Sequence, residues 1–209
     1  MLFRSGTASK LEELGAIPIT ISGPDGYILD EEGVLGEKID YLLELRASGK
    51  NICKPYADKF KSAKFIEGKK PWEVKADMYI PCATQNEILI DDAKAIVASG
   101  AKYVCEGSNM SSSNEAIEYM LNNGIILGPS KAANAGGVAC SCIEMGQNSG
   151  KTVFKPEQVH AQLKDIMVNI HDAAKNAAEE YGYGYNLVAG ANIAGFLKVA
   201  DSMIAQGCV

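Results

Sequence analysis

The sequence predicts an α/β fold in which a mostly parallel sheet is followed by two long helices. In the middle of the chain, short strand-like runs alternate with helical runs, the order typical of βαβ units and parallel strands. Towards the carboxyl end, apolar residues recur every three or four positions over two long stretches, which indicates amphipathic helices. With 209 residues, the chain is long enough to bury one good-sized core.

The first third of the chain has a less regular pattern of short elements. Gly15 is expected to close a helix that ends in "SKLEELGA", because glycine adopts the left-handed conformation at helix ends. "GPDGY" (23–27) has the composition of a turn. The other expected elements here are a strand over 17–22, a helix over 37–48, a short helix over 55–60 and a strand over 63–67.

The middle and last thirds give the clearest pattern. Ser113 is a candidate cap for one of the helices, since its hydroxyl can accept from a backbone N–H of the first turn. Strands are expected over 76–83, 101–107 and 125–130, and helices over 90–100 and 113–124. The two long carboxyl-terminal helices are expected over 155–182 and 186–207.

Charge and composition limit the kinds of partner. The formal net charge is −6 and the pI is near 5.0, which argues against nucleic acid or an anionic membrane surface as the main partner. We find no signal peptide and no apolar run long enough to span a bilayer, so a cytoplasmic protein is expected.

The cysteines and histidines show no metal-binding or catalytic spacing. The six cysteines include no C-x-x-C pair, and Cys140 and Cys142 are too close together for a usual zinc site. Free thiols in a reducing compartment are the simpler interpretation. His160 and His171 each lie beside a core position of the same predicted helix, so we expect structural or surface roles for them and no metal site.

Uncharged polar residues follow each of the three middle strands. They lie in "PCATQNE" (81–87), "EGSNM" (106–110) and "PSKAANAGGV" (129–138), which we expect to be loops. Because parallel strands place their ligand sites at their carboxyl ends, these loops predict a smooth polar cleft for a large flat ligand such as a nicotinamide nucleotide. The alternative is that Gly, Ala, Ser and Asn are simply common turn residues.

A complete dinucleotide fold would begin with a strand and a G-x-G-x-x-G loop, and neither is evident at the start of this sequence. The next landmark is present, because "TISGPDG" ends a strand where the adenosine ribose is usually contacted. An acid there favours the free 2′-hydroxyl of NAD. The residues are Ser22, Gly23 and Pro24, with Asp25 slightly later, so the choice between NAD and NADP stays open.

Taken together, these segments resemble one known family. "ISGPDGYILD", "KPWEVKADMYIPCATQNEI", "YVCEGSNM", "PSKAANAGGVACS" and "YNLVAGANIAGFLKVADSMIAQG" resemble the carboxyl-terminal half of hexameric bacterial-type glutamate dehydrogenase. The resemblance implies a Rossmann-like doubly wound sheet that lacks its first strand and glycine loop. It also implies a single truncated dinucleotide-binding domain over 1–209, with 155–209 as a helical segment.

The resemblance further implies a reaction and a set of site residues. The family converts L-glutamate reversibly to 2-oxoglutarate and ammonia with NAD or NADP, as a homo-hexamer. The residues that match cofactor-binding positions are Ser22, Pro24, Asp25, Ala83, Thr84, Gly107, Ser108, Asn109 and Asn134, the last of these at the nicotinamide amide. Val138 and Ser141 match substrate-binding positions, and the Ser141 hydroxyl matches the group that holds the side-chain carboxylate of glutamate.

The resemblance places no catalytic residue in this chain. The family's catalytic lysines and aspartate belong to an amino-terminal domain without a counterpart here, so we expect the isolated chain to be inactive. Where the family usually has Pro-Thr-Thr, this sequence has Ser111, Ser112 and Ser113. Two alternatives remain: a non-catalytic nucleotide-binding or assembly fragment, and a dehydrogenase for apolar amino acids, which Ser141 disfavours.

Overall fold

The computed structural model describes residues 2–207, with side chains from Ser5 onward. The contacts divide the chain into two units, Met1–Val74 and Lys75–Val209, and each is described by itself below. The grouping of both units into one dinucleotide-binding domain over 1–209 stays a prediction.

The first unit is built on an antiparallel sheet. Its strands pair in the order β1-β2-β3. A two-residue turn, Pro24–Asp25, joins β1 to β2, and such a short connection requires antiparallel strands. The strands are β1 (Thr20–Gly23), β2 (Gly26–Asp30) and β3 (Ala63–Glu67), and the helices are α1 (Leu2–Glu13), α2 (Glu37–Ala47) and α3 (Lys54–Lys59).

Strand β2 was missed by the sequence interpretation, which placed a turn over 23–27. Gly26 opens this strand with φ 142°, and a Cβ there would lie 2.2 Å from the Ile66 carbonyl oxygen of β3. Glycine is therefore required by the close approach of the two strands, although its presence in the sequence favours a turn. The remaining elements expected in this unit are confirmed to within a few residues.

A buried carboxylate fastens the core of the first unit. Asp30, at the end of β2, is fully buried and accepts hydrogen bonds from Lys38 Nζ (2.8 Å), Tyr56 Oη (2.8 Å) and Ser62 Oγ (3.1 Å). Burial raises the pKa of Asp30, but these hydrogen bonds outweigh it and the pKa lies below its ordinary value. Burial and the bond to Asp30 raise the pKa of Tyr56. Asp30 is therefore held as the charged form.

The second unit contains the predicted parallel sheet. Its strands pair in the order β4-β5-β6, with Met78 opposite Tyr103 and Tyr103 opposite Ile126. Helices connect successive strands, as the alternating sequence pattern predicts. The elements are β4 (Met78–Tyr79), α4 (Ile90–Ala98), β5 (Tyr103–Cys105), α5 (Asn114–Asn122) and β6 (Ile126–Gly128). The expected cap of α5 is confirmed, because Ser113 Oγ accepts from the Ala116 N–H at 3.3 Å.

The segment after β6 is helical, so the expectation of a loop over 129–138 is wrong. A single turn, α6 (Ser130–Ala133), is followed at once by α7 (Ala135–Gly150), with Asn134 between them. The glycine pair at the start of α7 concealed the helix in the sequence. Gly136 has a packing role, because a Cβ there would contact Met167 Sδ at 3.6 Å and Leu163 Cδ1 at 3.7 Å.

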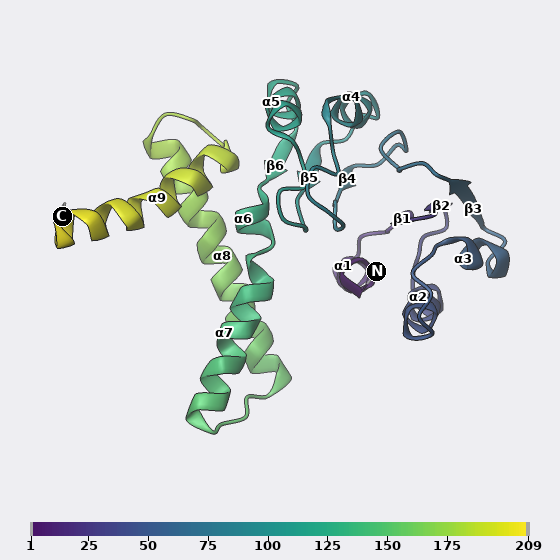
Figure 1. Ribbon diagram of the computed structural model, residues 1–209, viewed down its shortest axis with the longest axis horizontal. Helices are drawn as coiled ribbons and strands as arrows, with labels where there is room; N and C mark the ends of the chain where they lie inside the picture. Colours follow the sequence, from purple (N-terminus) through teal and green to yellow (C-terminus); the bar gives the residue numbers. More distant parts are fainter. Residues whose placement is uncertain (1, 208–209) are drawn as a thin grey trace. The chain divides into compact units, whose positions relative to one another are not determined.

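Two long helices complete the second unit, as expected. They are α8 (Pro156–Glu180) and α9 (Leu187–Gln206), and α7 runs beside α8 (Figure 1). The backbones of α8 and α9 touch where they cross, since a Cβ on Gly190 would lie 1.8 Å from the Ala174 carbonyl oxygen. Asn186 begins α9 by accepting from the Val188 and Ala189 N–H groups.

Helix α9 corrects one statement about the sequence. This 20-residue helix is long and apolar enough to cross a membrane by length and composition. Leucine, valine, isoleucine and phenylalanine provide most of its apolar character, and Lys198 and Asp201 interrupt the apolar run. The expectation that no such run exists is therefore wrong for α9. The first turns of the helix pack against α8, as Figure 1 shows.

The contact at Gly190 predicts the effect of adding one methyl group. Gly190→Ala should lower the free energy of unfolding by about 1–3 kcal/mol, because α9 must move away from the Ala174 carbonyl. Gly195→Ala in the same helix should raise it by about 0.5–1 kcal/mol, because its Cβ would meet no atom within 4 Å. Urea unfolding followed by circular dichroism measures both. Equal effects of the two substitutions would contradict the close crossing.

The Asp30 network predicts acid sensitivity of the first unit. The folded-state pKa lies below the unfolded value, so Asp30 contributes stability above the unfolded pKa of about 3.9 and loses it as the pH falls through the folded pKa. Asp30→Asn should lower the free energy of unfolding at neutral pH by about 3 kcal/mol, because Lys38 loses its buried partner. Asp40→Asn, on the exposed side of α2, is the control. The difference between the two variants, measured by urea unfolding, should shrink towards pH 3 and would be constant if Asp30 were not charged.

Candidate functional site

In the second unit, the segments that follow β4 and β5 are bonded to each other through their backbones. The N–H groups of Gly107 and Ser108 both donate to the Pro81 carbonyl at 3.0 Å. Further along, the Asn86 N–H donates to the Met110 carbonyl at 2.8 Å. The predicted proximity of these two strand-end segments is therefore confirmed.

The segment after β6 is attached to the segment after β5 by Glu106. This side chain is 2 % exposed, and its two carboxylate oxygens accept from different N–H groups. Oε1 accepts from Ser112 at 2.8 Å, and Oε2 accepts from Ser130 at 2.9 Å. One buried carboxylate thus bonds to both segments, 106–113 and 129–134.

Two asparagines meet at this edge of the sheet. Asn134, between α6 and α7, donates from Nδ2 to Asn109 Oδ1 at 2.6 Å. Next to them, the Met110 N–H donates to Ser130 Oγ at 3.2 Å, and Met110 has φ 47°, an uncommon conformation for a residue with a side chain. The structure therefore brings together the two asparagines that the sequence places at successive strand ends.

The other cofactor-binding candidates of this unit lie in the same segments. Ala83 and Thr84 are exposed, and the Ala83 N–H donates to Glu87 Oε2 at 3.2 Å. Gly107 and Ser108 are half-buried, and the Ser108 and Ser111 hydroxyls lie 2.6 Å apart. These contacts fix the backbone of both segments and leave small polar groups at the edge.

The two substrate-binding candidates lie on the first turns of α7. Val138 is 65 % exposed, and Ser141 is exposed three residues further, on the same side of the helix. The Ser141 hydroxyl donates to the Gly137 carbonyl at 3.3 Å. A Cβ on Gly137 would meet no atom within 4 Å, whereas Gly136 faces α8. The glycine pair therefore has two roles, packing at Gly136 and an open surface at Gly137.

The remaining candidates, Ser22, Pro24 and Asp25, belong to the first unit. Ser22 lies on β1 opposite Tyr27, and Pro24 is exposed in the turn. Asp25 accepts from the Cys53 N–H at 2.8 and 2.9 Å and from the Lys54 N–H at 2.9 Å. Its carboxylate is therefore fixed by the backbone that begins α3.

Charged side chains at the strand ends of the second unit are already engaged. The segments 80–89, 106–113 and 129–134 contain Glu87, Glu106 and Lys131. Both glutamates are buried and accept from backbone N–H groups, and Lys131 Nζ donates to Asn192 Oδ1 of α9. This edge can orient a ligand by hydrogen bonds, but these groups are not placed to exchange protons with it.

The histidines and cysteines form no metal site in the part of the chain that the structure describes. His171 lies 2.9 Å from Tyr185 Oη and 3.0 Å from Asp172 Oδ1, so it links α8 to the connection before α9. Cys105, Cys140 and Cys142 are free thiols, and Cys208 lies outside the described residues. Burial, with the neighbouring Glu106, raises the pKa of Cys105.

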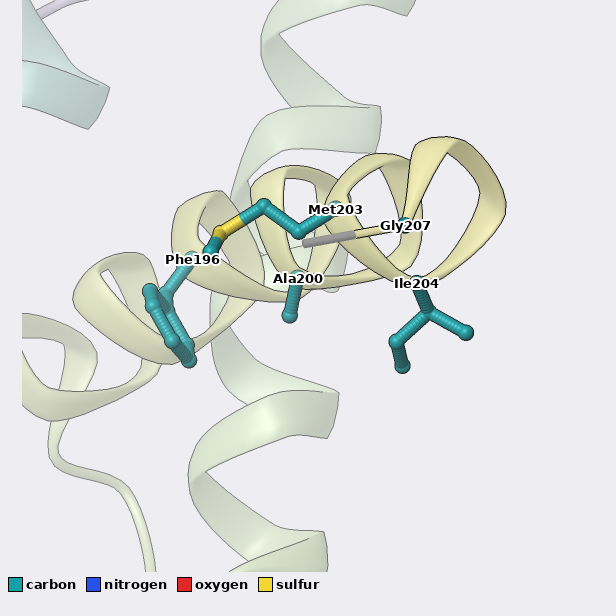
Figure 2. A pocket seen from close by; sticks show the side chains of 5 residues that line it. All are labelled: Phe196, Ala200, Met203, Ile204 and Gly207. Atoms are coloured by element: carbon teal, nitrogen blue, oxygen red, sulfur yellow. The ribbon is translucent and has the colours of Figure 1, made fainter. Parts of the chain in front are cut away.

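An apolar depression lies on α9. Figure 2 shows its lining: Phe196, Ala200, Met203 and Ile204 of this helix, and Gly207 directly after it. Phe196 and Ile204 are 65 % and 80 % exposed. The lining has no polar side chain that could orient a reacting substrate, so the strand ends remain the candidate site.

Sequence reasoning missed the role of Glu106. It was interpreted only as the end of a strand and the start of the loop "EGSNM", because no spacing marks a carboxylate whose partners are backbone N–H groups. The available signal was an acid directly after an apolar strand, "YVCE", where a buried charge requires close partners.

Comparison with known proteins shows close relatives over nearly the whole chain. The NAD-specific glutamate dehydrogenase of Clostridium symbiosum is 52% identical over 204 residues, 97% of this chain and 45% of the relative. The NADP-specific glutamate dehydrogenase of Giardia intestinalis is 46% identical over 203 residues, 96% of this chain and 45% of the relative. This chain thus spans slightly less than half the length of these relatives.

Solved structures agree with the fold. One glutamate dehydrogenase matches with a TM-score of 0.94 at 52% identity, covering 98% of this chain and 46% of that chain. The Plasmodium falciparum glutamate dehydrogenase matches with a TM-score of 0.93 at 42% identity, covering 98% and 44%. The expected Rossmann-like fold class is confirmed by these matches.

The family model described as glutamate/leucine/phenylalanine/valine dehydrogenase matches residues 5–207. The chain therefore belongs to the glutamate/leucine/phenylalanine/valine dehydrogenase family.

Proposed function

We propose that this chain is the cofactor-binding part of a glutamate dehydrogenase, an oxidoreductase that converts L-glutamate reversibly to 2-oxoglutarate and ammonia with NAD or NADP. The observation that supports this most directly is the Asn109–Asn134 pair at the strand ends. Relatives that match nearly the whole of this chain are named both NAD-specific and NADP-specific glutamate dehydrogenases. The proposal rests on this site together with the family.

The asparagine pair fits the carboxamide of a nicotinamide ring. Among residues 2–207, Asn134 Oδ1 and Asn109 Nδ2 have no hydrogen-bond partner, so the pair offers an acceptor and a donor side by side. A carboxamide has the complementary donor and acceptor. A nicotinamide cofactor bound there would accept the hydride from the α-carbon of glutamate. The role of Asn134 is to orient that ring by its amide.

The other candidates would contact the rest of the cofactor. Ala83, Thr84, Gly107 and Ser108 present small polar groups along the strand ends, which permits close approach of a flat ligand. In the first unit, Ser22, Pro24 and Asp25 would face the adenosine ribose. The fixed carboxylate of Asp25 repels a 2′-phosphate, so we expect NAD to bind more tightly than NADP.

The exposed side of α7 would hold the substrate. Ser141 can turn its hydroxyl from the Gly137 carbonyl to a carboxylate of glutamate, which is a stronger acceptor. Val138 would cover the aliphatic part of the substrate. Because a hydroxyl without a partner costs binding energy, Ser141 favours glutamate over leucine or phenylalanine.

The proton transfers would be performed by residues outside the strand-end segments. Oxidation of an amine requires a base for the substrate ammonium and an acid/base for the water that attacks the imine. Glu87, Glu106 and Lys131 are bound to other groups, so we propose no catalytic residue in this chain and no activity of the chain alone.

The oligomeric state, compartment and partners of the protein are also proposals. We infer a homo-oligomer, a hexamer as in the resembled family, working in the cytoplasm on L-glutamate, 2-oxoglutarate and ammonia. The net charge of −6 supports an absence of nucleic-acid and membrane-surface partners.

The purified 209-residue chain tests whether this part binds the cofactor without catalysing the reaction. We expect no reduction of NAD or NADP in the presence of glutamate. Titration with NAD, followed by NMR, should shift the side-chain amide signals of Asn109 and Asn134, while NADP should shift them less. Measurable turnover would contradict the absence of catalytic residues, and unshifted Asn109 and Asn134 signals would contradict the nicotinamide assignment.

A chimera tests substrate recognition. This chain would replace the matching 45% of the Clostridium symbiosum glutamate dehydrogenase, and the product would be assayed for NAD-linked glutamate oxidation. In the chimera, Ser141→Val should lower kcat/KM for glutamate roughly ten- to a hundredfold, the loss expected for one hydrogen bond to a charged group. Ser149→Val, exposed on the same helix, is the matched control and should leave kcat/KM unchanged. A normal kcat/KM for Ser141→Val would exclude this serine from substrate binding.

A further inference from the structure

We infer that Glu106 is the positioning residue of the nicotinamide end of the site. Its buried carboxylate holds the Asn109 segment and the Asn134 segment at a fixed separation before any ligand binds. The inference rests on the proposed function for its ligand, but the arrangement itself is a property of this chain.

The first step is the geometry of the carboxylate. Glu106 follows β5 directly, and its own N–H donates to the Gly128 carbonyl at the end of β6. Its side chain then reaches Ser112 on its own segment and Ser130 on the next. The two oxygens thus each accept one backbone N–H from a different segment, at 2.8 and 2.9 Å.

The second step is what these bonds position. Asn109 lies between Glu106 and Ser112 along the chain, and Asn134 lies one helical turn after Ser130. Each asparagine therefore lies within four residues of a serine whose N–H donates to the Glu106 carboxylate. Ser130 adds a parallel link, because its hydroxyl accepts from the Met110 N–H. The 2.6 Å contact between the asparagines is thus supported on both sides.

The third step is why a carboxylate is needed. Both Ser112 and Ser130 present N–H donors, so the group between them must accept twice. Glutamine would offer one acceptor oxygen and turn its NH2 group towards the other N–H. A buried charge is costly without close partners, and here two charge-assisted hydrogen bonds compensate it. Glu106→Gln therefore breaks one of the two links while conserving the size of the side chain.

The experiment compares Glu106→Gln with Glu118→Gln in the complete 209-residue chain. Glu118 is exposed on α5, so its variant controls for the same change of charge. Hydrogen exchange reports on the links: the Ser112 or the Ser130 N–H should exchange on the order of tenfold faster in Glu106→Gln only. Thermal unfolding shows whether the fold is retained.

NAD titration followed at the Asn109 and Asn134 side-chain amides separates positioning from folding. We expect the apparent Kd to weaken on the order of tenfold in Glu106→Gln while the Tm stays near that of Glu118→Gln. An unchanged Kd in a folded Glu106→Gln overturns the positioning role. If the wild-type chain shows no response to NAD, the proposed function fails, and the role of Glu106 fails with it. If the wild-type chain and both variants respond equally to NAD, only the positioning role of Glu106 is overturned.

Ser130→Ala decides the case in which Glu106→Gln does not fold. This variant removes the hydroxyl that accepts from Met110 but leaves the buried charge and its two N–H partners in place. A weaker Kd for NAD with normal exchange at Ser112 supports positioning by this network. A wild-type Kd overturns it.

Discussion

The parallel alignment of β4, β5 and β6 is the constraint on which the candidate site depends. Parallel strands end at the same edge of a sheet, so the segments after them meet although more than forty residues separate the first from the last. Main-chain hydrogen bonds from Gly107 and Ser108 to Pro81 then join neighbouring segments. The asparagines that we assign to the nicotinamide ring are close because the strands are parallel.

The helices impose a second, independent constraint. Gly136 permits α7 to pack against α8, and Gly190 permits α9 to touch the α8 backbone. Lys131 of α6 then bonds to Asn192, two residues after Gly190. The position of α6, and of Asn134 directly after it, is therefore connected to helix packing as well as to the sheet. This explains how glycines outside any turn affect the geometry of a polar edge.

Sequence patterns predicted much of this arrangement because they depend on local rules. The alternation in the middle of the chain and the three-four spacing of the last helices gave the fold class and most element bounds. Strand β2 and the first turn of α7 were not predicted. Gly26 and Gly137 favour irregular structure locally, and only their neighbours in the fold order them. The role of Glu106 was not predicted for a related reason, because its partners are backbone N–H groups and produce no recognisable residue spacing.

The site residues of the second unit were predicted individually, but their contacts were not. The sequence placed Asn109 and Asn134 at successive strand ends, yet gave no indication that they bond to each other. Asp25 was predicted as a ribose contact, and the structure adds its bonds to the Cys53 and Lys54 N–H groups. Such long-range pairs depend on the folded backbone, which residue type alone does not specify.

Cys105, the half-buried neighbour of Glu106, has a consequence for redox chemistry. Thiols react with oxidants as thiolates, and burial, with the adjacent carboxylate, raises the pKa of Cys105 so that its thiol stays protonated. Cys105, directly before Glu106, is thus less reactive towards peroxide and disulfide exchange, chiefly because of burial and also because of the adjacent carboxylate. By contrast, the exposed Cys142 on α7 lacks the protection of burial.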